Sequence, residues 1–121
     1  MTNNIKIGDE GEILAVAYLL KKGYKILEKK WRFAHKEIDI ISKIDNIIVI
    51  VEVKTRKKNS IINPAEAVTI KKQKHLIAAA QAYIEQNNLN NNIRFDIISI
   101  VYSGNKADIE HIEDAFYPYL L

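Results

Sequence analysis

The chain has 121 residues, of which 48% are hydrophobic and 27% are charged, so it has the composition of a globular protein with one core. It contains no cysteine, which excludes disulfides, zinc–thiolate sites and a thiol nucleophile. The formal net charge of +3 permits a polyanionic partner but does not require one. Because the N-terminus lacks the apolar run of a signal peptide and no stretch has the roughly 18 apolar residues of a membrane span, we expect a cytoplasmic protein without a membrane partner.

The N-terminal segment predicts a helix followed by a strand. Asp9 fits the N-cap of the helix, and Gly23 lies just past its end. Residues 24–33 then predict a strand with charged residues along one side. The apolar residues that recur at helical spacing are Ile13, Val16, Ala17 and Leu20.

Two β-branched segments, 36–42 and 47–54, predict a hairpin with its turn at Asp45 and Asn46. A basic loop over residues 54–64 follows the second strand.

A long helix is predicted next, starting from either Asn63 or Thr69 and ending at about Gln86. In the first alternative, Asn63, Pro64 and Glu66 fit the N-cap, N1 and N3 positions.

The C-terminal third predicts a polar turn at 87–92, an apolar strand at 93–102 and a short edge strand at 108–112. We therefore expect an α/β fold with a mixed central sheet flanked by helices, in the order α-β-β-β-α-β with one further strand. No internal repeat or linker interrupts it, so residues 1–121 are expected to form a single domain.

The hairpin places charged side chains together within an apolar surround. If Asp45 and Asn46 form the centre of the turn, residues whose numbers sum to 91 lie opposite each other, so Asp39 faces Glu52 and Glu37 faces Lys54. All four side chains then share one face of the hairpin, since side chains alternate along a strand.

Opposite residues have β-carbons about 5 Å apart, and like charges held there are destabilising. Two such carboxylates tend to share a proton or hold a cation, and Mg²⁺ bound by two carboxylates and waters suits this geometry. The alternative is an exposed sheet face whose charges are simply solvated. Because Ile41 and Ile50 come next on the same face, the polar patch is local, which favours a site.

The stretches GEILAVAYLLKKGYKILEKKWR, EIDII, VIVEVKTR, IKKQKHL and RFDII resemble the YraN-like family of small bacterial proteins. That family is similar to PD-(D/E)XK nucleases, especially archaeal Holliday-junction resolvases, and the resemblance runs from about residue 8 to residue 116. It implies a restriction-endonuclease-like fold. Two positions depart from the family pattern: Lys36 stands where glycine is usual before Glu-Ile-Asp, and Lys30 where asparagine is usual before Trp-Arg.

Carried over to this sequence, the resemblance implies a Mg²⁺ or Mn²⁺ ion held by the carboxylates of Asp39 and Glu52. The backbone carbonyl of Val53 would complete that side, and Glu12 would approach from the first helix. Lys54 would contact the scissile phosphate or the attacking water, where a cation stabilises developing negative charge. Lys54 could also form an ion pair with Glu37. Glu37 is therefore either an acid that supports the site or a surface partner of Lys54.

Glu12 and Gln73 have competing interpretations. Asp9 and Glu12 have the spacing of a capping box, yet Ala15 and Leu19 lie beside Glu12 and indicate a partly buried face. Gln73 leads an apolar stripe of the second helix, so its amide could orient a ligand at the site or satisfy a nearby backbone group.

Two basic segments flank the proposed site and predict a phosphate-binding surface, although charge runs are often only solvated faces. Three functions follow: a metal-dependent nuclease acting on phosphodiester bonds, a non-cutting nucleic-acid-binding module, or a protein–protein adaptor. We expect DNA rather than RNA as substrate. The resemblance to junction resolvases makes branched DNA a natural trial substrate and suggests a homodimer, since two cuts need two sites. The residues of the basic surface are Arg56, Lys57, Lys58, Lys71, Lys72 and Lys74.

Overall fold

The structure is a computed structural model that describes residues 3–58 and 68–117, with side chains from residue 9 onward. The alternative helix start at Asn63 lies outside the described residues. The elements in chain order are α1 (Asn3–Lys21), β1 (Lys25–Phe33), β2 (Lys36–Ile44), β3 (Ile47–Lys57), α2 (Ile70–Gln86), β4 (Asn92–Ser103) and β5 (Lys106–Phe116).

The strands form one mixed sheet in the spatial order β1-β2-β3-β4-β5. Neighbouring strands are antiparallel except β3 and β4, which are parallel and are joined by the α2 crossover. The predicted α/β class, mixed sheet and order of elements are confirmed. The further strand is present as β5 and is longer than the predicted 108–112.

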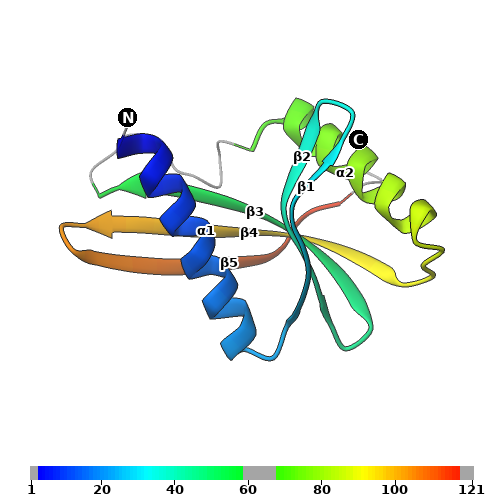
Figure 1. Cartoon of the computed structure of the whole chain (residues 1–121), viewed down its shortest axis with the longest axis horizontal. Coiled ribbons are helices and arrows are strands. Elements are labelled where there is room, and N and C mark those ends of the chain that lie inside the picture. The colour runs from blue at the N-terminus through cyan, green and yellow to red at the C-terminus, as the bar shows by residue number, and fades with distance from the viewer. Residues whose placement is uncertain (1–2, 59–67, 118–121) are drawn as a thin grey trace.

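Both faces of the sheet are covered, so the hairpin does not have a single core face (Figure 1). Helix α1 lies across β3 and β4 on one face, and α2 packs against β2 on the other. On the α1 side, Val49 and Val51 are buried together with Ile98. On the α2 side, Ile41 and Ile50 are buried beneath the helix, so the face that carries the predicted charged patch is itself part of a core.

The face of α1 that contacts the sheet includes the large side chain of Leu19 as well as two small residues. Gly11 and Ala15 are buried, whereas Ile13 and Leu20 are 68% and 54% exposed. A β-carbon on Gly11 would collide with the Cγ2 methyl of Thr55, so α1 approaches β3 too closely for a side chain there. The apolar spacing thus predicted the helix correctly but did not mark its buried face.

The turn between β2 and β3 forms where the sequence predicted it. Asp45 and Asn46 have φ angles of 48° and 71°, as a two-residue turn of the hairpin type requires. The pairs Ile44–Ile47 and Ile40–Val51 follow the sum of 91. The predicted register is therefore confirmed as far as Ile40–Val51, and the charged positions lie beyond this last pair.

Helix α2 begins at the second of the two predicted positions. The hydroxyl of Thr69 accepts a hydrogen bond from the backbone N–H of Lys72 at 3.1 Å, which is an N-cap contact. Within the described part of the chain, neither helix is long and apolar enough to cross a membrane.

Candidate metal and phosphate site

Asp39 and Glu52 lie together at the point where the β2–β3 ladder ends. The last backbone pair is Ile40–Val51, and beyond it the Oδ2 atom of Asp39 accepts a hydrogen bond from the backbone N–H of Val53 at 2.8 Å. The side chain thereby takes the place of the next ladder contact. This bond fixes the Asp39 carboxylate beside the Glu52 side chain.

Burial and, after it, the negative charge of Glu52 together raise the pKa of Asp39 to about 8. The hydrogen bond from the Val53 N–H opposes this shift but does not cancel it. Burial beside a second acid thus favours the protonated form of the Asp39 carboxyl when no cation is bound.

Glu52 is only 4% exposed, and two lysines hold one of its oxygens. The Nζ atoms of Lys54 and Lys72 lie 3.4 Å and 3.5 Å from Oε2. The other oxygen, Oε1, is buried and accepts no hydrogen bond from any residue that the structure describes. A buried carboxylate oxygen without a donor is costly, and a bound cation would satisfy it.

The pair does not form a complete ligand set by itself. Among the described residues, no three Asp, Glu, His or Cys side chains gather closely enough to hold a metal ion. Two adjacent carboxylates with an unsatisfied oxygen still fit Mg²⁺ or Mn²⁺, because such ions commonly take one or two carboxylates and keep several waters.

Glu12 lies in the same electrostatic neighbourhood but is not a capping residue. Helix α1 begins at Asn3, so Asp9 is inside the helix and is not its N-cap; its carboxylate instead accepts a hydrogen bond from Lys30 Nζ at 3.1 Å. Partial burial raises the pKa of Glu12, the Lys30 charge lowers it, and the charges of Glu37 and Glu52 add to the rise.

Glu37 and Gln73 have partners of their own. Glu37 accepts a hydrogen bond from Arg32 Nε at 3.1 Å, so the cross-strand pair with Lys54 that the register suggested does not form. The Gln73 amide donates to the Val68 carbonyl at 3.1 Å, which is the backbone role considered for it. Metal ligation by the Val53 carbonyl remains a prediction.

The structure brings one of the predicted basic residues directly to the carboxylate pair. Lys72 contacts Glu52, whereas Lys71 and Lys74 are exposed on the first turns of α2. Lys57 and Lys58 lie past Lys54 at the end of β3, where they line an open hollow of about 660 Å³ with Glu10 and Tyr102. Arg56 is half-buried in the same strand.

The sequence matches a known protein family. The model of a family described as uncharacterised protein family UPF0102 matches residues 11–100. The chain belongs to this family. The resemblance to YraN-like proteins is thereby confirmed. The matched region includes α2 and all the predicted site residues.

UPF0102 relatives match over nearly their whole length. A UPF0102 protein of Clostridioides difficile (strain 630) is 51% identical over 115 residues, covering 94% of this chain and 99% of the relative. One of Phocaeicola vulgatus is 43% identical over 118 residues, covering 98% of each. One of Flavobacterium psychrophilum is 45% identical, covering 97% of this chain and 98% of the relative.

Lys30, one of the two departures from the family pattern, has an unusual backbone in this UPF0102 protein. Its φ angle is 51°. Lys30 is not itself paired with β2, but the pairs on either side of it are Lys29–Ile40 and Trp31–Ile38, so Lys30 lies opposite Asp39. Asparagine, which the resemblance places here, adopts positive φ more readily than lysine. The family preference therefore has a backbone reason.

A second buried carboxylate lies on the α1 side of the sheet. Asp96 in β4 is 1% exposed; it receives bonds from Arg94 at 2.9 and 2.8 Å and from the Asp114 N–H at 3.0 Å, and contacts His111 Nε2 at 2.7 Å. Burial raises its pKa, but the bonds from His111, Arg94 and Asp114 outweigh burial and lower it overall. The charged residue inside the apolar segment RFDII was the sequence signal for this network.

Proposed function

We propose that this UPF0102 protein is a divalent-metal-dependent nuclease that hydrolyses phosphodiester bonds, with DNA as its substrate. The observation that carries the proposal is the state of Glu52: a buried carboxylate with one oxygen held by two lysines and the other without a donor. A purely structural carboxylate would have both oxygens satisfied, as Asp96 does.

Asp39 and Glu52 would hold Mg²⁺ or Mn²⁺, which when bound lowers the pKa of a water and offsets charge on a phosphate. The protein's own groups then have defined tasks. The Val53 N–H orients the Asp39 carboxylate. Lys54 and Lys72, which approach from a strand and a helix, supply two ammonium groups where phosphoryl oxygens would develop charge.

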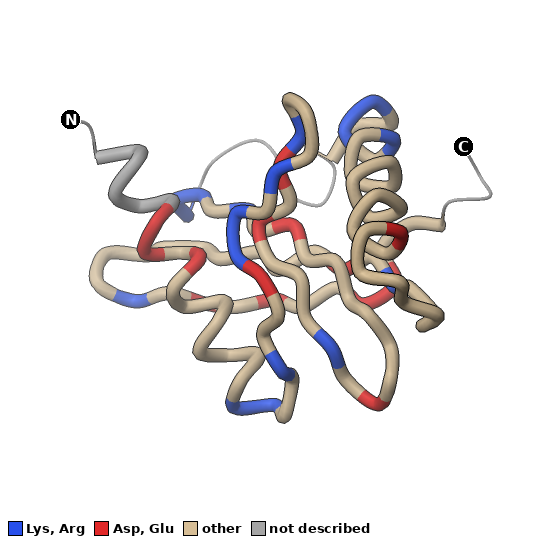
Figure 2. The backbone as a smooth tube through the Cα atoms, turned by 45° about the vertical axis from the view of Figure 1, so that its right-hand side comes forward, with Lys and Arg blue, Asp and Glu red and all other residues tan. Residues whose placement is uncertain are grey.

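The distribution of charge supports a polyanion approaching from one side of the sheet. Edge strand β1 carries four basic residues and one acidic residue, whereas the opposite edge strand β5 carries one lysine and four acidic residues. Figure 2 shows basic positions along β1 and in the first turns of α2. The β5 edge would repel nucleic acid, so contact is expected at β1 and α2.

Metal binding is tested first, without nucleic acid. We expect calorimetric titration with Mn²⁺ to show binding to the wild type that is lost in Asp39→Asn. Asp108→Asn is the matched control, because Asp108 is an exposed aspartate of β5. Equal binding by wild type and Asp39→Asn would contradict the assignment of the site.

Cleavage is then tested on labelled four-way junctions, forks and linear duplexes with Mg²⁺ or Mn²⁺. Asp39→Asn and Lys54→Ala should abolish cleavage while circular dichroism shows an intact fold. Undiminished cleavage by both variants would overturn the proposal.

A non-cutting nucleic-acid-binding module is the second candidate. The observation that favours it is that Asp39 and Glu52 form a pair and not a complete ligand cluster among the described residues. Salt-sensitive binding of nucleic acid, together with no cleavage and no Mn²⁺ binding, would support this module over the nuclease.

A further inference from the structure

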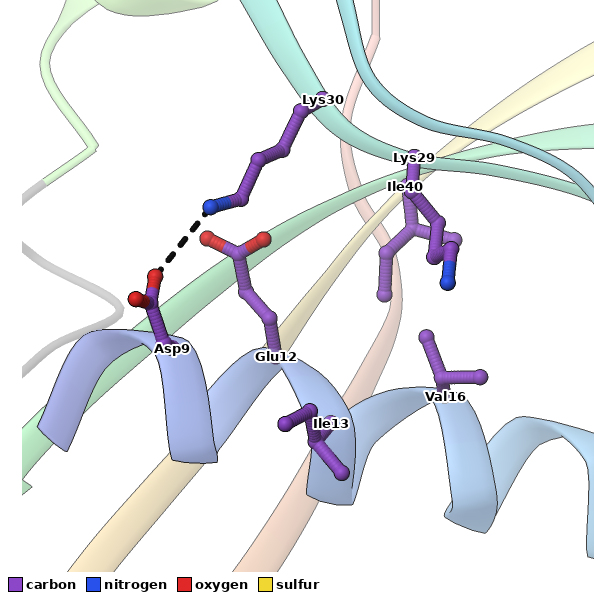
Figure 3. A pocket seen from close by; sticks show the side chains of 7 residues that line it. All are labelled: Asp9, Glu12, Ile13, Val16, Lys29, Lys30 and Ile40. Atoms are coloured by element: carbon purple, nitrogen blue, oxygen red, sulfur yellow. Dashed lines mark hydrogen bonds and ion pairs between the residues drawn. The ribbon is translucent and has the colours of Figure 1, made fainter. Parts of the chain in front are cut away.

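A pocket of about 420 Å³ opens between α1 and β1. Its apolar lining consists of Ile13, Val16 and Ile40, and its polar lining of Asp9, Glu12, Lys29 and Lys30 (Figure 3). Two lining residues bring the pocket near the proposed metal site: the charge of Glu12 acts on Asp39, and Lys30 lies opposite Asp39 between the β1–β2 pairs Lys29–Ile40 and Trp31–Ile38. Apolar pockets of this size with a few polar groups are typical of small-ligand sites.

Two features of the pocket are unfavourable for folding alone. Ile13 leaves a large apolar side chain 68% exposed at the pocket. Lys30 has a φ angle of 51° within a strand, a conformation that a lysine rarely adopts. Backbone strain of this kind is common at ligand sites, where it aims a side chain. Here the Lys30 side chain reaches from β1 across the pocket to Asp9 on α1 (Figure 3).

We propose that this pocket binds the base of an unpaired nucleotide next to the phosphate that lies at the Asp39–Glu52 pair. The inference rests on the proposed function and adds its substrate class: nucleic acid that has a single-stranded segment beside the cut. A base pair inside a duplex could not enter, because its base is stacked and paired.

The lining matches the parts of a nucleotide. The apolar side chains of Ile13 and Val16 offer a surface for the flat face of a base. Lys29 and Lys30 supply cations for the adjoining phosphates. The carboxylates of Asp9 and Glu12 can accept hydrogen bonds from amino or ring N–H groups, which bases carry and a sugar–phosphate chain without a base does not.

The test compares substrates that differ only in the base. Fluorescence anisotropy with Ca²⁺ in place of Mg²⁺ would measure binding of a labelled duplex with a short single-stranded tail and of the same duplex with an abasic tail. We expect the wild type to bind the base-bearing tail about fivefold more tightly, the lower end for one stacked base.

Variants locate the effect. Ile13→Asn removes the apolar wall and should abolish the preference for the base-bearing tail, whereas Leu20→Asn should retain it. Leu20 is the matched control because it is another exposed apolar residue of α1, and it is not among the residues that line the pocket. Lys30→Asn removes the cation at a position that suits asparagine, and it should weaken binding of both tails.

The outcomes separate this inference from the function on which it rests. Salt-sensitive binding of both tails with equal affinity would overturn the base pocket and leave nucleic-acid binding intact. An equal loss of preference in Ile13→Asn and Leu20→Asn would also overturn it, since the effect would then belong to α1 in general. No binding of any substrate would overturn the proposed function as well.

Discussion

The Nζ atom of Lys72 in the first turn of α2 lies 3.5 Å from Oε2 of Glu52 in β3, although the whole β3–α2 connection separates the two residues in sequence. Lys54, on the same strand as Glu52, contacts the same oxygen at 3.4 Å. The start of α2 is therefore part of the candidate site.

Lys72→Ala should reduce cleavage more than Lys71→Ala does. Lys71 is the matched control because it is the preceding residue of the same helix but is exposed. We expect the Lys72 variant to lose about tenfold or more in kcat, because one positioned cation would no longer stabilise charge on the phosphate. Steady-state kinetics at fixed salt would measure this. Equal effects of the two substitutions would mean that Lys72 acts only through general attraction.

The stability of the metal-free protein should fall as the pH rises from about 4 to about 8. Asp39 has a folded-state pKa of about 8, well above its ordinary value of 3.8, so the unfolded chain releases its proton first. The contribution of Asp39 to stability is complete below its ordinary pKa. It is lost as the pH rises to the folded-state pKa, by at most about 1.4 kcal/mol per pH unit. Urea unfolding with a chelator present would show the slope. Asp39→Asn should flatten it, whereas Asp108→Asn should not.

Asp39 and Asp96 should respond in opposite directions to the same substitution. Asp96→Asn should destabilise the protein by about 3 kcal/mol at pH 7, because it removes the buried charge that Arg94 and His111 contact and leaves Arg94 only the exposed Glu113. Asp39→Asn should stabilise the metal-free protein at pH 8, because it removes a carboxylate that ionises against burial and a neighbouring acid. The free energy of unfolding from urea titration compares them. Destabilisation by both would argue that Asp39 is a structural residue.

The lowered pKa of Asp96 has its own consequence at acid pH. Its contribution to stability is complete above the ordinary value near 3.8 and is lost as the pH falls through the lower folded value. The stability difference between the wild type and Asp96→Asn should therefore shrink below about pH 4. A difference that stays constant down to pH 2 would contradict the hydrogen-bond network as its source.

Gly11→Ala should destabilise the protein by about 1–3 kcal/mol, because the added methyl group would collide with Cγ2 of Thr55. Thr55→Ser removes that methyl group, so the double variant should recover part of the loss. Thermal unfolding of the two single variants and the double variant completes the cycle. Strictly additive effects would show that the helix has shifted and that the two residues no longer meet.

The site could be predicted where it depends on local pattern. The turn at Asp45 and Asn46 fixes the hairpin register, and the register places Asp39 beside Glu52. The contact between Lys72 and Glu52 depends on how α2 docks, which no spacing within the chain encodes. The lysine was predicted only as part of a basic surface for that reason.

Helix packing was the least predictable feature. Apolar spacing in α1 included Ile13 and Leu20, which are exposed, whereas the residues buried against the sheet are Gly11, Ala15 and Leu19. Hydrophobicity alone does not reveal which face is buried. The backbone conformation of Lys30 could not be predicted either, because a lysine in a strand gives no indication of a positive φ angle.

The irregular edge strands have a consequence for self-association. Strand β1 has a register shift between Ile26 and Glu28 and exposed lysines, and β5 has a register shift near its end and a row of acids. Bulges and like charges on an edge prevent another chain from extending the sheet. Two copies would therefore not join by pairing the same edges. The same features protect the folded protein from edge-to-edge aggregation.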